Sequence, residues 1–180
     1  MLRGNRVLLR ALERDDLPAL HAIQNVLEVE ALANDQRPRP VSLAHMQATF
    51  DARASAGERG VIRFVIDLDG VVIGDAQLHT FDDYSLTCHL GIALDVDHLG
   101  VGYGSETVGV LADYAFEYLH IRKLCLEVLA HDERAVGAYR KAGFVDEGRF
   151  VGQCWHRGAY RDVFRMARFA PWAEAAGPAA

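Results

Sequence analysis

The sequence lacks long apolar stretches. No run approaches the roughly 20 apolar residues that a helix needs to cross a bilayer, and the first residues do not contain the apolar segment of a secretory signal. We therefore expect a cytoplasmic protein with no membrane partner. Cysteine is also scarce: Cys88, Cys125 and Cys154 stand at spacings that fit neither a zinc site nor a disulfide framework. We expect free thiols and no bound metal.

An excess of positive charge is absent as well. The 180 residues contain 19 Lys and Arg against 25 Asp and Glu, a formal net charge of -6, which argues against nucleic acid as the main partner. With 51% hydrophobic and 24% charged residues, the composition is that of a globular protein. The length favours a single domain, which we place at residues 1–170, and we expect the alanine-rich tail at 171–180 to be frayed.

Hydrophobic periodicity predicts a chain of strands and helices. The Asp69-Gly70 dipeptide lies between two strand-like runs and predicts a tight hairpin turn, whereas Pro38 and Pro40 predict a non-helical loop at 34–40. This order predicts an α/β (α+β) fold with a mixed, mostly antiparallel sheet of about seven strands flanked by about four helices. We expect strands at about residues 5–11, 61–68, 71–79, 84–94, 122–129, 144–154 and 160–168, and helices at about 15–24, 42–56, 103–119 and 132–142.

A glycine-rich segment separates a strand-like run from an amphipathic helix. It spans residues 99–106 and reads LGVGYGSE. Glycine permits positive φ and a close approach of ligands to the backbone, and the first amides of a helix have no acceptor within it. Such a segment is either a tight turn or a site for phosphate oxygens at the helix start. No Gly-Lys-Ser/Thr follows the glycines, which excludes a Walker-type phosphate loop.

A second segment, HDERAVGAYRKAGF at residues 131–144, resembles the second signature of the GNAT family of N-acetyltransferases, and the glycine-rich segment resembles their acetyl-CoA pyrophosphate loop. Residues 6–17 look like the opening strand and first helix of that family. Residues 158–166 are similar to the last strand of the branch with ribosomal-protein N-terminal and spermidine acetyltransferases. The resemblance implies a GNAT fold, acetyl-CoA as co-substrate and direct transfer of an acetyl group to a primary amine.

The resemblance also implies roles for single residues. The backbone at 92–94 would orient the thioester, and Tyr139 would protonate the departing thiolate, which suits a phenol that is protonated at neutral pH. The alternative for Tyr139 is a tyrosine of the core. Asp132 replaces an asparagine of many relatives, and we expect it to be a helix N-cap. The cofactor-binding positions expected in this way are Ile92, Ala93, Leu94, Leu99, Gly100, Val101, Gly102, Tyr103, Gly104, Ser105, Asp132, Ala135 and Tyr139.

The general base is less clearly marked. His89 stands at a strand position where relatives often have glutamate, and a neutral imidazole can accept a proton; a structural histidine is the alternative. His79, Asp82 and Asp83 are neighbours that could line the same cleft. Deprotonation at pH 7 costs about 1 kcal/mol for an α-amine but about 4.6 kcal/mol for a lysine- or polyamine-type amine. A site without a conspicuous carboxylate beside His89 therefore favours a weakly basic amine.

Two positions depart from the family pattern. Leu99 stands where relatives have glutamine or arginine, and Val101 stands where this branch often has lysine. Loss of one charge-assisted hydrogen bond to a phosphate costs about 1.5–3 kcal/mol of binding free energy. Arg134, Arg140 and Lys141 are the candidates to supply the missing charge.

The acceptor amine stays open at this point. A peptide or ribosomal-protein N-terminus, a polyamine and an aminoglycoside-like small amine all fit the resemblance, although Arg37 and Arg39, in a segment with few acids, argue against a polycation. The alternative to an enzyme is a non-catalytic acyl-CoA-binding sensor or interaction module, with Leu99 and Asp132 as signs of lost activity. A homodimer is a further expectation from the resemblance.

Overall fold

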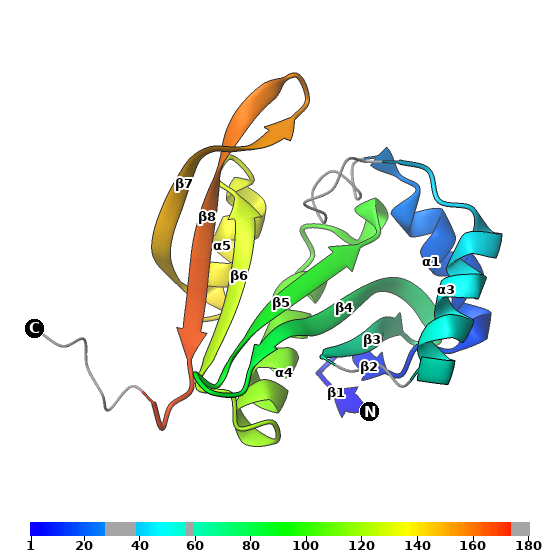
Figure 1. Ribbon diagram of the computed structural model, residues 1–180, viewed down its shortest axis with the longest axis horizontal. Coiled ribbons are helices and arrows are strands. Elements are labelled where there is room, and N and C mark those ends of the chain that lie inside the picture. The colour runs from blue at the N-terminus through cyan, green and yellow to red at the C-terminus, as the bar shows by residue number, and fades with distance from the viewer. Residues whose placement is uncertain (28–38, 57–59, 174–180) are drawn as a thin grey trace, which may run out of the picture.

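A single mixed sheet runs through the molecule (Figure 1). The computed structural model describes residues 1–27, 39–56 and 60–173, and its eight strands follow the order β1-β2-β3-β4-β5-β6-β8-β7. Neighbouring strands are antiparallel except for β5 and β6, which are parallel. The strands are β1 (Leu2–Arg3), β2 (Leu8–Arg10), β3 (Val61–Leu68), β4 (Val71–Asp82), β5 (Thr87–Leu94), β6 (Lys123–Leu129), β7 (Val145–His156) and β8 (Ala159–Phe169).

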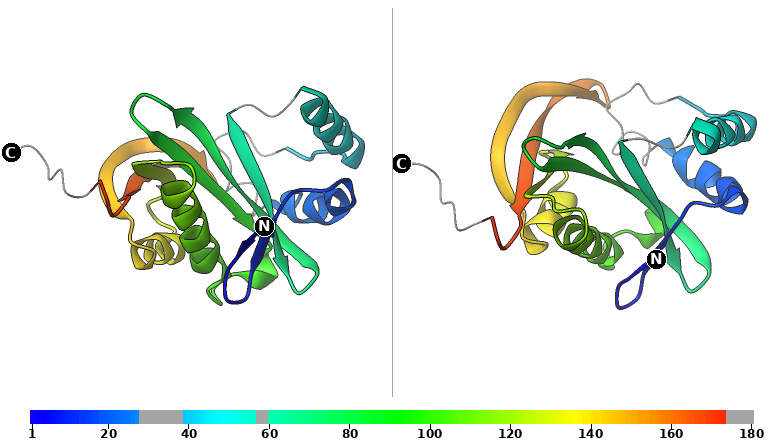
Figure 2. Two further views of the ribbon diagram at one scale, coloured as in Figure 1. Left: turned by 90° about the horizontal axis from the view of Figure 1, so that it is seen from below. Right: turned by 60° about the horizontal axis from the view of Figure 1, so that its bottom comes forward.

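Helices lie on both faces of this sheet (Figures 1 and 2). Along β4, Ala76 and Leu78 point into the core beneath α4, whereas Asp75 and Gln77 face α1 and α3, because successive side chains of a strand alternate between faces. The α-helices of the described residues are α1 (Leu17–Gln24), α3 (Leu43–Ala56), α4 (Tyr103–Glu117) and α5 (Glu133–Lys141), and two 3-10 turns stand at Arg14–Asp16 and Val96–His98.

Local sequence signals explain where several elements begin and turn. The hydroxyl of Ser42 accepts a hydrogen bond of 3.2 Å from the amide of His45, as expected of the N-cap of α3. At the β3–β4 turn, Asp69 and Gly70 have φ of 51° and 88°, the paired positive values that a two-residue hairpin requires. The predicted cap and the predicted hairpin are therefore confirmed.

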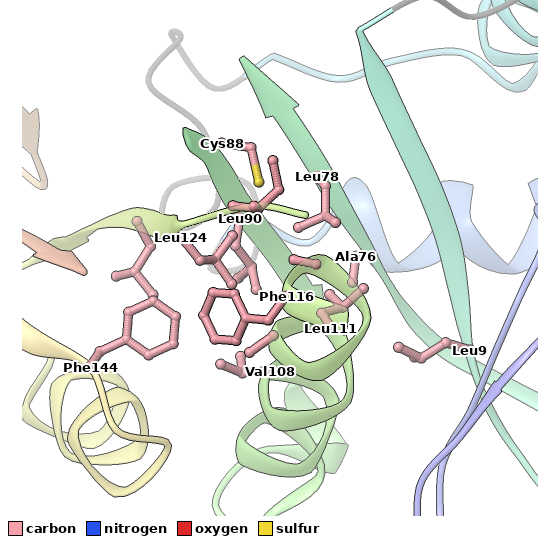
Figure 3. Packing of buried hydrophobic residues seen from close by; sticks show 14 of the residues in the cluster. Leu9, Ala76, Leu78, Cys88, Leu90, Val108, Leu111, Phe116, Leu124 and Phe144 are labelled. Atoms are coloured by element: carbon pink, nitrogen blue, oxygen red, sulfur yellow. The ribbon is translucent and has the colours of Figure 1, made fainter. Parts of the chain in front are cut away.

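The core lies between the sheet and α4 (Figure 3). Val108 and Leu111 of α4 pack against strand side chains such as Leu78 and Leu124, and these four side chains are at most 1% exposed. Phe144, just after α5, closes the same cluster. Each large side chain buried in this way contributes about 1.5–3 kcal/mol, so α4 is fixed on the sheet and its N-terminus has a defined place.

The sheet splits in the middle. Strands β5 and β6 pair at three positions, from Thr87 with Lys123 to His89 with Cys125. Beyond these pairs the two strands diverge, so that β1–β5 and β6–β8 form the two arms of a V (Figure 1). The edge of β5 from residue 90 onward therefore faces the gap between the arms.

A few boundaries differ from the sequence prediction. The additional strand, β1, has two residues and is too short to produce an alternating pattern. Strand β4 continues to Asp82 through an irregularity near Thr80, whose φ is 52°. The predicted loop at 34–40 lies outside the described residues except for its last two. In the predicted tail, Trp172 contacts His120 with ring centroids 4.9 Å apart, while residues 174–180 lie outside the described part.

Candidate functional site

The glycine-rich segment forms the turn into α4. Gly100 and Gly102 have φ of 77° and 98°, which side chains with a Cβ rarely adopt. The helical ladder begins with the amide of Glu106, which donates to the carbonyl of Gly102 at 3.1 Å. The amides of residues 103–105 precede this first bond and point out of the helix start, where the helix dipole favours an anion. The turn therefore has the geometry that the sequence predicted.

A cavity of about 140 Å³ opens between the arms of the sheet, and we call it the split cavity. The end of β5, the start of α4, the end of β6 and the start of α5 surround it. It brings together eight of the predicted cofactor positions, whereas residues 100–103 and 105 belong to the adjoining turn. The lining residues are Ile92, Ala93, Leu94, Val96, Leu99, Gly104, Val108, Glu127, Val128, Leu129, Asp132, Arg134, Ala135, Ala138 and Tyr139.

Tyr139 reaches the split cavity from the inner face of α5. Its ring lies 6.1 Å from that of Phe144, centroid to centroid, which anchors the phenol to the core. Burial of the phenol among protein atoms and, to a smaller extent, the carboxylate of Asp132 raise the pKa of Tyr139 to about 12. The phenol is thus a stable proton donor at neutral pH.

Asp132 caps α5, as predicted. Its Oδ1 accepts a hydrogen bond of 3.0 Å from the amide of Ala135, and its Oδ2 lies 3.3 Å from the guanidinium of Arg134. Arg134 also lines the split cavity, whereas Arg140 forms an ion pair of 2.6 Å with Asp146. Among the three candidate cations, Arg134 is the one that borders this cavity.

The structure adds a cation that the sequence did not indicate. Nη1 of Arg6 donates to the carbonyl of Val101 at 3.1 Å, and the guanidinium stacks on the ring of Tyr103 at 4.6 Å. A Cβ built on Gly102 would stand 3.0 Å from Nη2 of Arg6. Arg6 therefore touches three consecutive residues of the glycine-rich turn. About 95 residues separate the partners, so no local pattern could have shown this contact.

Glu106 completes the link between the N-terminus and the turn. Its carboxylate accepts hydrogen bonds from the amides of Arg6 at 2.6 Å and Val7 at 3.2 Å, and from Nε of Arg6 at 3.0 Å. Burial alone would raise the pKa of Glu106, but these hydrogen bonds outweigh it and hold the pKa below its ordinary value. The carboxylate therefore stays charged and paired at the start of α4.

A second cavity, of about 710 Å³, lies between the inner faces of α1 and α3 and strands β3–β5, and we call it the helix-side cavity. It has mixed walls, with apolar side chains and a group of polar ones. Ile92 and Ala93 line both cavities, so the two spaces meet at the end of β5. The lining residues are Ala11, Leu12, Leu17, Leu20, Gln24, Val41, His45, Met46, Thr49, Phe50, Arg53, Ala54, Arg63, Phe64, Asp75, Gln77, Gly91, Ile92 and Ala93.

Among the described residues that line the helix-side cavity, Asp75 is the one with a carboxylate. Nε2 of Gln24 lies 3.5 Å from its Oδ1. Burial raises the pKa of Asp75, and the Gln24 contact and the charge of Arg63 partly oppose this shift. Sequence reasoning missed Asp75. The alternation over 71–79 was a signal that could have found it, because alternation puts this side chain on the opposite sheet face from its buried neighbours.

His89 lies nearer the start of β5 than the β5 residues that line the cavities. It pairs with His79 of β4 on one side and with Cys125 of β6 on the other, and the rings of His79 and His89 are 5.8 Å apart. Neither histidine is among the residues that line the two cavities, and nor are Asp82 and Asp83. The role of His89 as base stays a prediction.

Other kinds of site find no support in the described part of the chain. Within residues 1–27, 39–56 and 60–173, no three His, Cys, Asp or Glu side chains gather as metal ligands would. The described helices also include none with the length and apolar character of a bilayer span. Cys88 and Cys125 are buried free thiols, and Cys154 is a partly exposed one.

Comparison with known proteins agrees with this arrangement. The model of the acetyltransferase (GNAT) domain family matches residues 6–145. Spermidine N(1)-acetyltransferase of Escherichia coli K12 is 27% identical over 169 residues, which are 94% of this chain and 89% of that protein. L-methionine sulfoximine/L-methionine sulfone acetyltransferase of Pseudomonas paraeruginosa is 31% identical over 150 residues, covering 79% of this chain and 83% of the relative.

A solved structure shares the whole architecture. Spermidine N-acetyltransferase from Vibrio cholerae, crystallised with CoA and spermine, superposes with a TM-score of 0.83 at 26% sequence identity. The match covers 92% of this chain and 96% of that one. The split sheet and both arms are therefore part of the shared fold.

Proposed function

The chain belongs to the GNAT family of acetyltransferases, and from this premise we propose that the split cavity holds the acyl end of acetyl-CoA and the helix-side cavity holds the acceptor amine. As a GNAT enzyme the protein transfers an acetyl group from acetyl-CoA to a primary amine. The observation that carries the proposal is the meeting of the two cavities at Ile92 and Ala93. A thioester on one side and an amine on the other would make contact there, without a covalent acyl-enzyme.

The residues present fit acetyl-CoA. The unpaired amides of residues 103–105 suit the diphosphate, and the largely apolar walls of the split cavity suit the pantetheine arm. The open edge of β5 at 92–94 offers backbone groups to the thioester carbonyl. Acetyl-CoA supplies the activated acyl group, and the protein supplies binding, orientation and proton transfer.

Tyr139 would donate its phenolic proton to the sulfur as the C–S bond breaks. A phenol with a pKa of about 12 is a weak acid toward an ordinary thiolate. The same largely apolar surroundings would also raise the proton affinity of the departing thiolate, because burial disfavours a charged sulfur. The rise in the pKa of the phenol is therefore offset in part by a rise in the basicity of the leaving group.

Replacement of Tyr139 by phenylalanine tests this role. The ring would keep its packing on Phe144, so we expect acetyl-CoA binding to change by less than about threefold while kcat falls about 100-fold, the usual contribution of a general acid. Tyr118→Phe is the matched control, because Tyr118 is 75% exposed at the end of α4. An unchanged kcat in Tyr139→Phe would remove the phenol from the mechanism.

For the acceptor we propose a small-molecule primary amine, and two classes have specific support. Polyamines are favoured by the relatives whose names give spermidine as substrate. The α-amine of an amino acid is favoured by the walls of the helix-side cavity, where Arg53 and Arg63 could face a substrate carboxylate while Asp75 faces the amine. A relative named for methionine sulfoximine and methionine sulfone supports this second class.

A thiol-release assay with an amine panel decides between them. The panel contains spermidine, spermine, methionine sulfone, free amino acids and short peptides with a free N-terminus. A polyamine enzyme should use spermidine with the highest kcat/KM, and an amino-acid enzyme should lose activity when the substrate carboxylate is amidated. If acetyl-CoA bound but no amine released thiol, the non-catalytic module predicted as the alternative would replace the proposal. The homodimer and the cytoplasmic location stay predictions.

A further inference from the structure

Asp75 occupies a distinctive place in the helix-side cavity. It lies on β4 with its side chain on the face toward α1 and α3, since Ala76 on the opposite face is buried beneath α4. Across the β4–β5 ladder, Asp75 pairs directly with Ala93. Ala93 lines both cavities, so the carboxylate stands one strand away from the point where they meet.

The surroundings of Asp75 combine a neutral amide contact with the charge of nearby cations. Gln24 contributes a neutral amide at 3.5 Å, a long contact that an incoming amine could replace. The charged or titratable described residues of the same cavity are Arg63 on β3 and His45 and Arg53 on α3. Burial raises the pKa of Asp75, which brings its basicity closer to that of an amine.

We propose that Asp75 is the general base that takes a proton from the acceptor ammonium before acyl transfer. This inference rests on the proposed function and identifies one residue of the same site. His89, the base that the sequence suggested, pairs with His79 and Cys125 and is not among the residues that line either cavity. Asp75 is thus better placed to reach an amine at the cavity junction.

The proton balance is complete with the residues named. The carboxylate of Asp75 takes one proton from the ammonium, and the free amine then attacks the thioester carbon. The C–N bond forms, the C–S bond breaks, and the phenol of Tyr139 gives its proton to the departing sulfur. The nitrogen, now an amide, loses its second proton to the phenolate of Tyr139, and Asp75 releases its proton to solvent through the helix-side cavity.

The test uses Asp75→Asn, which keeps the shape of the side chain and removes its basicity. With the best amine of the panel, we expect kcat at pH 7 to fall about 100-fold, as is usual on loss of a general base. The remaining rate should rise tenfold per pH unit up to the pKa of the amine, because the variant depends on amine that is already neutral. Affinity for acetyl-CoA, measured by calorimetry, should change by less than twofold, which would show that the variant is folded.

Two companion variants keep the result interpretable. Asp113→Asn changes a carboxylate on α4 that is 63% exposed, and it should leave kcat unchanged. Asp75→Glu should recover part of the activity, because it restores a carboxylate one methylene longer. A pH profile of Asp75→Asn that parallels the parent would overturn the proposal, as would a His89→Asn variant that alone lost the acidic limb of the profile. Failure of the proposed function is a different result, in which the parent enzyme releases no thiol with any amine.

Discussion

The link between the N-terminal segment and the glycine-rich turn leads to a sharp prediction about cofactor binding. Leu99 and Val101 leave the turn without the cationic side chain that the family pattern led us to expect. Arg6 instead brings a guanidinium to the turn by binding the carbonyl of Val101 and pairing with Glu106. Replacement of Arg6 by alanine removes that contact and leaves the charged carboxylate of Glu106 beside the turn that we propose as the diphosphate site.

The expected size follows from the exposure of the guanidinium that would face the diphosphate. An exposed ion pair contributes about 0.2–1 kcal/mol, whereas a hydrogen bond to a charged group contributes about 1.5–3 kcal/mol. The side chain of Arg6 is 47% exposed, so its interaction with the diphosphate should lie between these cases. We therefore expect a loss of about 1.4 kcal/mol, which is a tenfold rise in the Kd for acetyl-CoA.

Two acyl donors separate this effect from general damage. Arg6→Ala should raise the KM for acetyl-CoA about tenfold but leave kcat/KM for acetyl-pantetheine, which lacks the diphosphate, within about twofold. The double variant with Glu106→Gln should recover part of the affinity, because the unpaired negative charge is gone. Arg14→Ala, which breaks an exposed pair with Asp51, is the control. Equal losses with both donors, or no loss with either, would refute the reasoning.

Two further predictions concern stability. Asp132→Ala should lower the free energy of unfolding by about 1 kcal/mol through loss of the α5 cap and should also lower the pKa of Tyr139, whereas Asp132→Asn should keep the cap. Urea denaturation measures the stability and a spectrophotometric titration measures the pKa of the phenol, and equal stability of the two variants would contradict the cap. Arg10 binds Asp16 at 2.8 Å and Asp67 at 2.9 Å, and the Arg10 hydrogen bond holds the pKa of Asp16 below 3.8. The stability from this pair is complete above the unfolded pKa and is lost as the pH falls through the lower folded value, so Asp16→Asn should flatten the acid limb of a stability curve below about pH 4, and parallel curves would exclude the pair as the cause.

Local patterns predicted most of the fold because the elements near the site have strong local signals. The alternation of β3 and β4 and the Asp69-Gly70 turn specify a hairpin without any distant contact. Helix α4 carries its buried face at helical spacing, from Val108 to Phe116. The two-residue β1 has no such signal: although it pairs with the neighbouring β2, it is too short to show an alternating pattern.

The part of the site that the two sequence motifs form was predictable. The turn at 99–106 and the start of α5 are continuous segments, so their geometry follows from glycine conformation and helix capping. Arg6 and Asp75 escaped because their roles depend on partners in distant parts of the chain. Gln24 comes to Asp75 from α1, 51 residues away in sequence. Assignment of a base therefore required the packing of α1 against β4.

The placement of the three cysteines agrees with the proposed direct transfer of the acetyl group. An acyl-enzyme route requires a thiol or a comparable nucleophile at the junction of the two cavities. Cys88 and Cys125 are buried in the sheet, and burial raises the pKa of Cys88 to about 12, so that this thiol stays protonated. Cys154 is on β7, and none of the three cysteines is among the lining residues of either cavity. The side chains of Ile92 and Ala93, which line both cavities, cannot accept an acyl group, and this agrees with attack of the amine on the thioester itself. The divergence of β5 from β6 leaves room for the two reactants there.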